Sequence, residues 1–175
     1  MIEDKRERFL FLILFHYGLR ISECLALKWS DFKEDGLYIE RSACVKNDTG
    51  TVIFTSPKTS NSYRVYPLIK QLEPYVNGLE LRHGEFIFPG KFGNSVLGQS
   101  HVRRRVEKYA KMAGVKTIRL HEFRHSCVSN LLMHKLPVRL VARWVGDTES
   151  MVLNTYSLLL PSEKMTIADF INDNM

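Results

Sequence analysis

A histidine and an arginine stand three residues apart in the string HEFRH, which covers residues 121–125. A helix carries positions i and i+3 on one face, so His121 and Arg124 would lie side by side. An arginine fork binds a phosphate through two parallel hydrogen bonds, and an imidazole beside it can donate a hydrogen bond or move a proton. The pair therefore predicts a site that binds a phosphate group.

The same string also fits a second chemistry. His121 and His125 are four residues apart with Glu122 between them, which matches the His-Glu-x-x-His pattern of zinc proteases. A zinc hydrolase built on these three residues would need a further ligand downstream, and no cysteine or carboxylate has fitting spacing. We therefore expect no metal and keep the zinc hydrolase as an alternative.

Three further side chains could act on a phosphate. Arg20 lies just before a helix predicted to start at a Ser22 cap, where backbone N–H groups also favour anions. Lys58 lies in the turn PKTS, and a mobile ammonium there can donate a proton to a leaving oxygen. Tyr156 ends a predicted helix and could act as a nucleophile, although a single late tyrosine is more often a core or surface residue.

A mainly helical chain must position these side chains. Apolar periodicity and Gly or Pro boundaries predict helices over 4–17, 23–29, 67–77, 98–113, 121–134, 137–144, 148–156 and 162–172. Alternation and turn signals predict three antiparallel strands over 37–45, 51–55 and 62–66. The fold class is therefore α+β, mainly helical with a small three-stranded antiparallel sheet, and Lys58 falls between the last two strands.

The length of 175 residues fits one domain, and a hydrophobic share of 45% is enough for a core of its own. The longest apolar run, residues 9–15, is too short to span a bilayer. Three cysteines are an odd number without metal-ligand spacing, so we expect buried thiols in a reducing cytosol at Cys24, Cys44 and Cys127.

The net charge of +6 is compatible with a nucleic acid as partner. Charge is informative only where it clusters, and a cluster lies on the helix predicted over 98–113: Arg103, Arg104, Arg105, Lys108 and Lys111. A solvated helix face explains the cluster equally well, so charge alone does not decide the partner.

Taken together and in order, these pieces resemble the tyrosine recombinase, or phage integrase, family and its C-terminal catalytic domain. The resemblance extends over roughly residues 9–160 and is carried by the strings GLRISE with LALKWSDF, PKT with SYRVYPL, IRLHEFRHS, and WVGD with NTYS. Several ordered motifs are far more specific than any one of them.

The resemblance implies a site-specific DNA recombinase, or integrase, domain that breaks and rejoins DNA without a cofactor. Tyr156 would attack a phosphodiester and form a 3′-phosphotyrosyl intermediate. Arg20 and Arg124 would hold the non-bridging oxygens, and Lys58 would protonate the leaving 5′-oxygen. His121 would assist as a hydrogen-bond donor or proton carrier.

The resemblance also implies partners and surroundings. We expect double-stranded DNA as substrate, a homo-tetramer assembled on DNA from isolated monomers, no membrane association, and a cytoplasmic, bacterial or phage-encoded protein. Glu23 is expected to orient Arg20 through an ion pair. The expected contacts with DNA are Arg64, Arg103, Arg104, Arg105 and Lys108.

Two features depart from the family pattern. Asp147 stands where the family usually has His or Trp, and a carboxylate would repel a scissile phosphate. Asp147 could pair with Arg20 or Arg124, another donor could fill the role, or the protein could be a catalytically weak relative that binds DNA. The second departure is length, from which we expect a single catalytic domain over 1–175 with the N-terminal core-binding domain absent.

Overall fold

The computed structural model describes residues 2–45, 51–55, 63–78, 84–90, 95–157 and 172. Its helices are α1 (Lys5–Tyr17), α2 (Ile21–Leu25), the 3-10 turn η1 (Trp29–Asp31), α3 (Glu73–Val76), α4 (Gln99–Ala113), α5 (Leu120–Met133), α6 (Val138–Val145) and α7 (Glu149–Tyr156). Lys58 lies outside the described residues, as does the predicted helix over 162–172 except for its last residue. No helix within these ranges is long and apolar enough to cross a bilayer.

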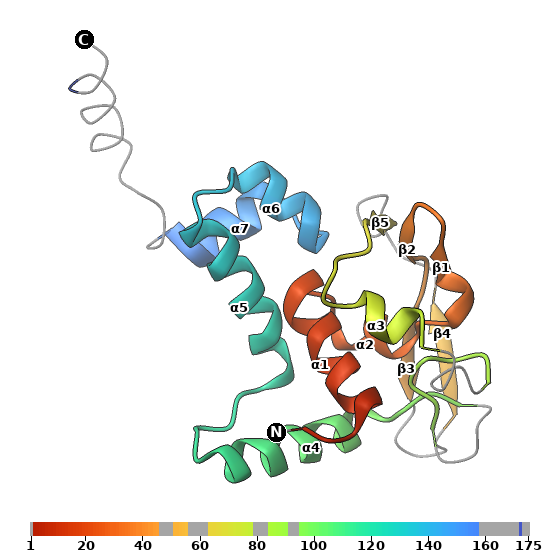
Figure 1. The fold of residues 1–175 in the computed structure, drawn as a ribbon. Helices are drawn as coiled ribbons and strands as arrows, with labels where there is room; N and C mark the ends of the chain where they lie inside the picture. The colour runs from red at the N-terminus through yellow and green to blue at the C-terminus, as the bar shows by residue number, and fades with distance from the viewer. Residues whose placement is uncertain are drawn as a thin grey trace.

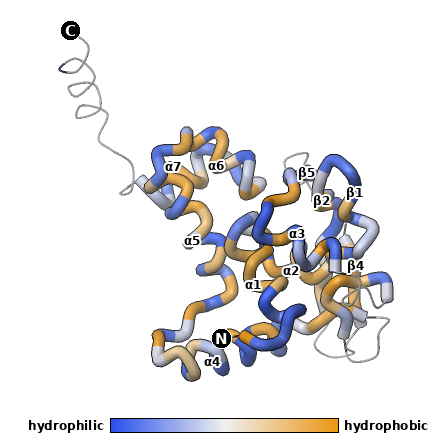
Figure 2. Tube along the Cα trace, viewed as in Figure 1, coloured by the Kyte–Doolittle hydropathy of each residue, from blue (hydrophilic) through white to orange (hydrophobic). Residues whose placement is uncertain are grey.

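Helix α1 is the centre of the molecule, with the strands on one side and α5 on the other (Figure 1). Its buried residues are Phe9, Leu10, Ile13, Leu14 and Tyr17. Figure 2 shows mostly hydrophobic colour along α1 and hydrophilic colour over much of α4. Burying one such large apolar side chain stabilises the fold by about 1.5–3 kcal/mol. A second apolar cluster joins α5, α6 and α7, so the helices that carry the candidate site have their own core.

The strands form two small sheets: β1 (Phe32–Lys33), β2 (Gly36–Ile39), β3 (Ser42–Val45), β4 (Val52–Thr55) and β5 (Arg64–Tyr66). Antiparallel pairing gives a three-stranded sheet in the order β1-β2-β5 and a separate β3-β4 pair. The predicted class, mainly helical with a small three-stranded antiparallel sheet, is confirmed. The prediction of a single strand over 37–45 is wrong, because the strand is interrupted at residues 40–41. There the Arg41 side chain donates to both Asp31 carboxylate oxygens at 2.8 and 2.6 Å.

The start of α2 differs from the sequence prediction. The helix predicted over 23–29 begins earlier in the structure, because α2 starts at Ile21 and Arg20 is its N-cap residue. The Glu23 carboxylate accepts the backbone N–H of Arg20 at 2.9 Å, which satisfies a donor that a helix start leaves unpaired. Helix α1 ends as predicted at Gly18, whose φ of 60° is in the left-handed region that glycine adopts readily.

The cysteines divide into two groups. Cys24 and Cys127 are buried as expected, whereas Cys44 is exposed. Successive residues of a strand point to opposite faces, and in β3 the buried neighbour is Ala43. The prediction that Cys44 is buried is therefore wrong.

Candidate active site

Residues from separate elements meet around a cavity of about 80 Å³. Its polar lining comes from the start of α5, from the turn between α6 and α7, and from the end of α7: His121, Arg124, His125, Asp147, Thr155 and Tyr156. Arg20, at the start of α2, donates through Nη2 to the carbonyl oxygen of Gly146 at 3.3 Å. The structure thus brings five of the predicted catalytic positions together, Arg20, His121, Arg124, Asp147 and Tyr156.

Arg124 is the most constrained side chain of the site. Its side chain is only 5% exposed, and Nη1 donates to the carbonyl oxygens of Gly18 at 2.8 Å and Val145 at 2.6 Å. These bonds tie α5 to the ends of α1 and α6. Burial lowers the pKa of Arg124, and the charge of nearby Arg20 lowers it further. Two positive groups therefore converge here, as an anion-binding site requires.

Asp147 forms an ion pair with Arg124. The Asp147 Oδ2 atom lies 2.9 Å from Arg124 Nη2, and the carboxylate is 28% exposed. Of the three interpretations of this substitution, the pairing with Arg124 is the one seen in the structure. The carboxylate thus occupies a donor, Arg124 Nη2, that could otherwise bind an anion.

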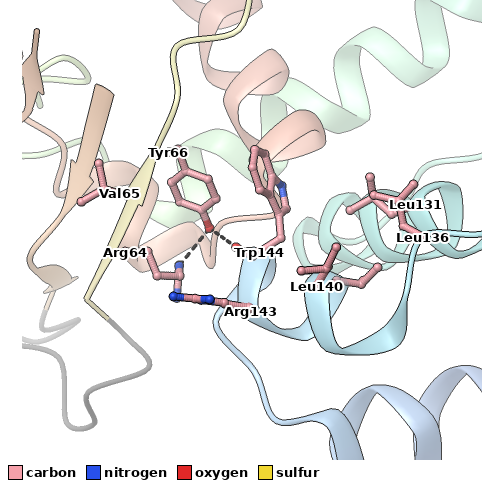
Figure 3. Close-up of a pocket in the computed structure, with 9 residues that line it drawn as sticks. Arg64, Val65, Tyr66, Leu131, Leu136, Leu140, Arg143 and Trp144 are labelled. Atoms are coloured by element: carbon pink, nitrogen blue, oxygen red, sulfur yellow. Dashed lines mark hydrogen bonds between the residues drawn. The ribbon is translucent and has the colours of Figure 1, made fainter. Parts of the chain in front are cut away.

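Arg20 is held by a buried chain of charges. Arg20 Nη1 lies 3.1 Å from Glu23 Oε1, which confirms the expected ion pair. Arg64 Nη2 donates to Glu23 Oε2 at 2.7 Å. Arg64 Nε donates to Tyr66 Oη at 2.9 Å (Figure 3). The side chain of Arg64 is only 6% exposed. A direct DNA contact of Arg64 is therefore not supported, and its contacts make it a support for Glu23 and Arg20.

Gly146 fits the corner after α6 because it has no side chain. Its φ is +69°, and an added Cβ would lie 1.7 Å from Arg64 Nη1. Arg64 thus packs directly on the glycine whose carbonyl oxygen holds Arg20.

Tyr156 is the last residue of α7 and is half-buried. Its hydroxyl is hydrogen-bonded to His125 Nδ1, and the two ring centroids are 5.6 Å apart. Burial raises the pKa of Tyr156; the charge of Arg124 lowers it, and that of Asp147 raises it. The sequence pattern marks His125 only as a possible zinc ligand, although its spacing of four from His121 places both on one helix face.

His121 is exposed at the cavity. Partial burial lowers its pKa below the usual 6.5, and the charges of His125, Arg124 and Arg20 lower it further. The imidazole is therefore neutral at pH 7, and it can donate one hydrogen bond and accept another.

The zinc alternative has little support in the described part of the chain. No group of three or more His, Cys, Asp or Glu side chains lies close enough there to hold a metal ion. Glu122 instead accepts a hydrogen bond from the backbone N–H of Arg119 at the start of α5, and His125 is hydrogen-bonded to the Tyr156 hydroxyl. A third ligand would have to come from residues outside the described ranges.

The basic residues of α4 differ in their surroundings. Arg103, Arg104 and Lys108 are exposed. Arg105 pairs with Glu7 of α1, with Nε 2.6 Å from Oε1. The α4 surface therefore offers exposed charges, while Arg105 also fixes α4 to α1.

A larger cavity of about 530 Å³ lies between β5 and the helices α5 and α6 (Figure 3). Its wall is largely apolar and includes Leu131, Leu136, Leu140 and Trp144. His121, Arg124 and Tyr156 line the smaller cavity instead, so the candidate chemistry belongs there.

Comparison with known proteins identifies the family. Residues 2–162 match the model of the phage integrase family, and the chain belongs to this family. It is 26% identical over 198 residues to a tyrosine recombinase XerC-like protein of Caldanaerobacter subterraneus subsp. tengcongensis, covering 98% of this chain and 50% of the relative. It is 28% identical over 177 residues to the ICEBs1 integrase of Bacillus subtilis, covering 93% and 48%. The chain thus spans about half the length of these relatives.

Solved structures show the same fold. The Tn1549 transposon integrase, in complex with transposon right end DNA, superposes with a TM-score of 0.80 at 19% identity, covering 99% of this chain and 60% of that one. XerA recombinase gives a TM-score of 0.61 at 15% identity, with 99% and 63% covered. The fold is therefore that of tyrosine recombinase catalytic domains.

Proposed function

We propose that this protein is a site-specific DNA recombinase, or integrase, that breaks and rejoins DNA through a 3′-phosphotyrosyl intermediate on Tyr156. The observation that carries the proposal is the convergence of Tyr156, Arg124 and His121 on one cavity, with Arg20 beside it. A nucleophile and two guanidinium groups are what transfer of a phosphodiester requires. Membership of the phage integrase family supports the same reaction.

The residues divide the reaction between them. Tyr156 Oη forms a bond to phosphorus while the bond from phosphorus to the 5′-oxygen breaks. Arg20 and Arg124 offset the charge that develops on the non-bridging oxygens, and His121 donates a hydrogen bond to one of them. Lys58 supplies the proton that the leaving 5′-oxygen takes up. The new ester keeps the energy of the broken bond, so rejoining needs no cofactor.

A catalytically weak relative that binds DNA is the second candidate function. The ion pair between Asp147 and Arg124 favours it, because the carboxylate takes a donor that the phosphate needs. An active enzyme must turn Asp147 away from Arg124 when DNA enters. The side chain is 28% exposed and lies in the turn before α7, which gives it room to turn.

The proposed partner is double-stranded DNA, on which the protein assembles as a homo-tetramer, and the proposed location is the cytoplasm of a bacterial cell. The related Tn1549 integrase was solved with transposon DNA. Exposed Arg103, Arg104 and Lys108 on α4 have the charge for contacts with the phosphate backbone. Such contacts give affinity with little sequence information.

A nicked suicide duplex carrying the junction of the protein's own element tests the proposal. Cleavage there releases a short strand that diffuses away, so the covalent protein–DNA product accumulates. The expected result is a covalent band with the wild-type chain and none with Tyr156→Phe. A native-gel shift without a covalent band would favour the binding-only relative, and neither band nor shift would contradict both candidates.

A further inference from the structure

The hydroxyl of Tyr156 has a specific partner, Nδ1 of His125, in the neighbouring helix. The contact joins the last residue of α7 to the second turn of α5, across 31 positions of sequence. Both side chains are half-buried and line the same small cavity as Arg124. The proposed reaction leaves one proton without an acceptor, the phenolic proton of Tyr156.

We propose that His125 accepts the proton of Tyr156 through Nδ1 as the hydroxyl attacks phosphorus. This inference rests on the proposed recombinase function. The bond from Tyr156 Oη to phosphorus forms, the bond from phosphorus to the 5′-oxygen breaks, and the phenolic proton moves to His125. The leaving oxygen takes a separate proton from Lys58, and the protons return in the reverse step.

The phenol needs such an acceptor. Burial raises the pKa of Tyr156, so the hydroxyl keeps its proton at neutral pH. A neutral phenol is a weak nucleophile, and a base within hydrogen-bond reach removes this limit. The hydrogen bond to His125 also fixes the direction of the Tyr156 hydroxyl.

His125 suits this role better than His121. Within the described residues, His125 contacts the Tyr156 hydroxyl, whereas His121 makes no hydrogen bond to it. The two imidazoles meet edge to face, with centroids 4.6 Å apart and an angle of 90° between the rings. His121 thus packs against His125 from the exposed side and is left to serve the phosphate.

Charged and titratable groups from three parts of the fold face His125. His121 and Arg124 lie on its own helix, Asp147 lies on the turn between α6 and α7, and Tyr156 lies on α7. Asp147 partly compensates Arg124 and favours the imidazolium once it forms.

The first test separates proton transfer from simple positioning. In His125→Asn, the amide oxygen lies near the position that Nδ1 has in the wild type. It can accept the hydrogen bond from Tyr156 but cannot take up the proton. We expect His125→Asn to bind DNA like the wild type but to cleave about 100-fold more slowly in a single turnover. The acid limb of the wild-type pH profile should also disappear. A wild-type rate and profile would overturn the proposal. His134→Asn is the matched control, because this exposed histidine lies just after the same helix.

The second test identifies which oxygen the proton serves. A substrate with sulfur in place of the bridging 5′-oxygen has a leaving group that needs no proton. This substrate should restore cleavage by Lys58→Ala but not by His125→Asn. Recovery of His125→Asn on the sulfur substrate would assign His125 to the leaving group and overturn the proposal.

The third test uses unaltered protein, so it does not depend on the folding of a variant. Long-range proton–nitrogen spectra of the chain labelled with nitrogen-15 histidine report which ring nitrogen carries hydrogen. We expect Nδ1 of His125 to be unprotonated and to shift in Tyr156→Phe. A proton on Nδ1 would make His125 the donor and contradict the proposal. If the wild type forms no covalent adduct, the recombinase function fails; if it does and His125→Asn cleaves equally fast, only this inference fails.

Discussion

The carboxylate of Asp147 lies 2.9 Å from Nη2 of Arg124, whose Nη1 already donates to two carbonyl oxygens. The guanidinium proposed to bind the scissile phosphate is therefore already paired with an internal anion. The usual His or Trp at this position would offer a hydrogen-bond donor, whereas Asp offers acceptors only. Under the proposed function, Asp147 would compete with DNA for Arg124, and this competition can be measured.

Asp147→Asn should strengthen DNA binding. The amide removes the negative charge that repels phosphate and can still accept a hydrogen bond from Arg124. We expect the affinity to rise by roughly tenfold, which corresponds to about 1.4 kcal/mol, measured by fluorescence anisotropy at fixed salt. Glu149→Gln removes the same charge nearby, from an exposed pair with Arg139 at 4.0 Å, and serves as the control. Weaker binding by Asp147→Asn would show that the carboxylate supports the site.

Gly146→Ala should destabilise the fold more than Gly114→Ala. Both glycines have a positive φ, +69° and +66°, so alanine costs about 1–2 kcal/mol at either position for the backbone alone. Only at Gly146 does the new Cβ meet Arg64, because nothing lies within 4 Å at Gly114. Urea unfolding should show the larger loss for Gly146→Ala. Equal losses would contradict the packing of Arg64 on this corner.

Cys44 should be the only one of the three cysteines that reacts in the folded protein. Burial raises the pKa of Cys127 to about 11 and that of Cys24 well above its ordinary value. A raised thiol pKa keeps the proton on at pH 8, and the thiolate is the reactive form. Mass spectrometry after iodoacetamide should find one modified site at pH 8 and three in urea. Rapid labelling of Cys127 in the native protein would contradict the packing of α5 against α1.

Arg104 and Arg105 should respond differently to the same substitution. Arg104 is exposed on α4, whereas Arg105 pairs with Glu7 at 2.6 Å. We expect Arg104→Gln to weaken DNA binding and to reduce the slope of log affinity against log salt by about 0.9, as loss of one phosphate contact does. Arg105→Gln should mainly lower the melting temperature. An unchanged salt slope for Arg104→Gln would remove α4 from the proposed DNA surface.

Local spacing was enough to predict part of the site. His121 and Arg124 share a helix face because a helix repeats about every four residues, and Gly18 ends α1 because glycine tolerates a positive φ. The roles of Arg20 and Tyr156 came from the order of motifs, since neither residue is distinctive alone. The structure adds that α2, α5, α7 and the turn between α6 and α7 bring the site residues together.

Contacts between distant residues could not be predicted from spacing. Arg64 is predicted from the sequence to contact DNA, but its guanidinium instead reaches Glu23, which is 41 positions away. The bond from His125 to Tyr156 likewise depends on how α7 packs beside α5. Cys44 has apolar neighbours in the sequence, yet its side of β3 faces solvent. In each case the packing of helices and strands against one another decides which contacts a side chain makes, and the local sequence pattern carries no information about that packing.

The most direct test of the central claim is to locate the covalent bond to DNA. The adduct from the suicide duplex is digested with nuclease and then protease, and the peptides are analysed by tandem mass spectrometry. The account predicts a nucleotide attached through its 3′-phosphate to the peptide that contains Tyr156, with the mass on the tyrosine. A nucleotide on another residue, or an adduct that persists in Tyr156→Phe, would contradict the account.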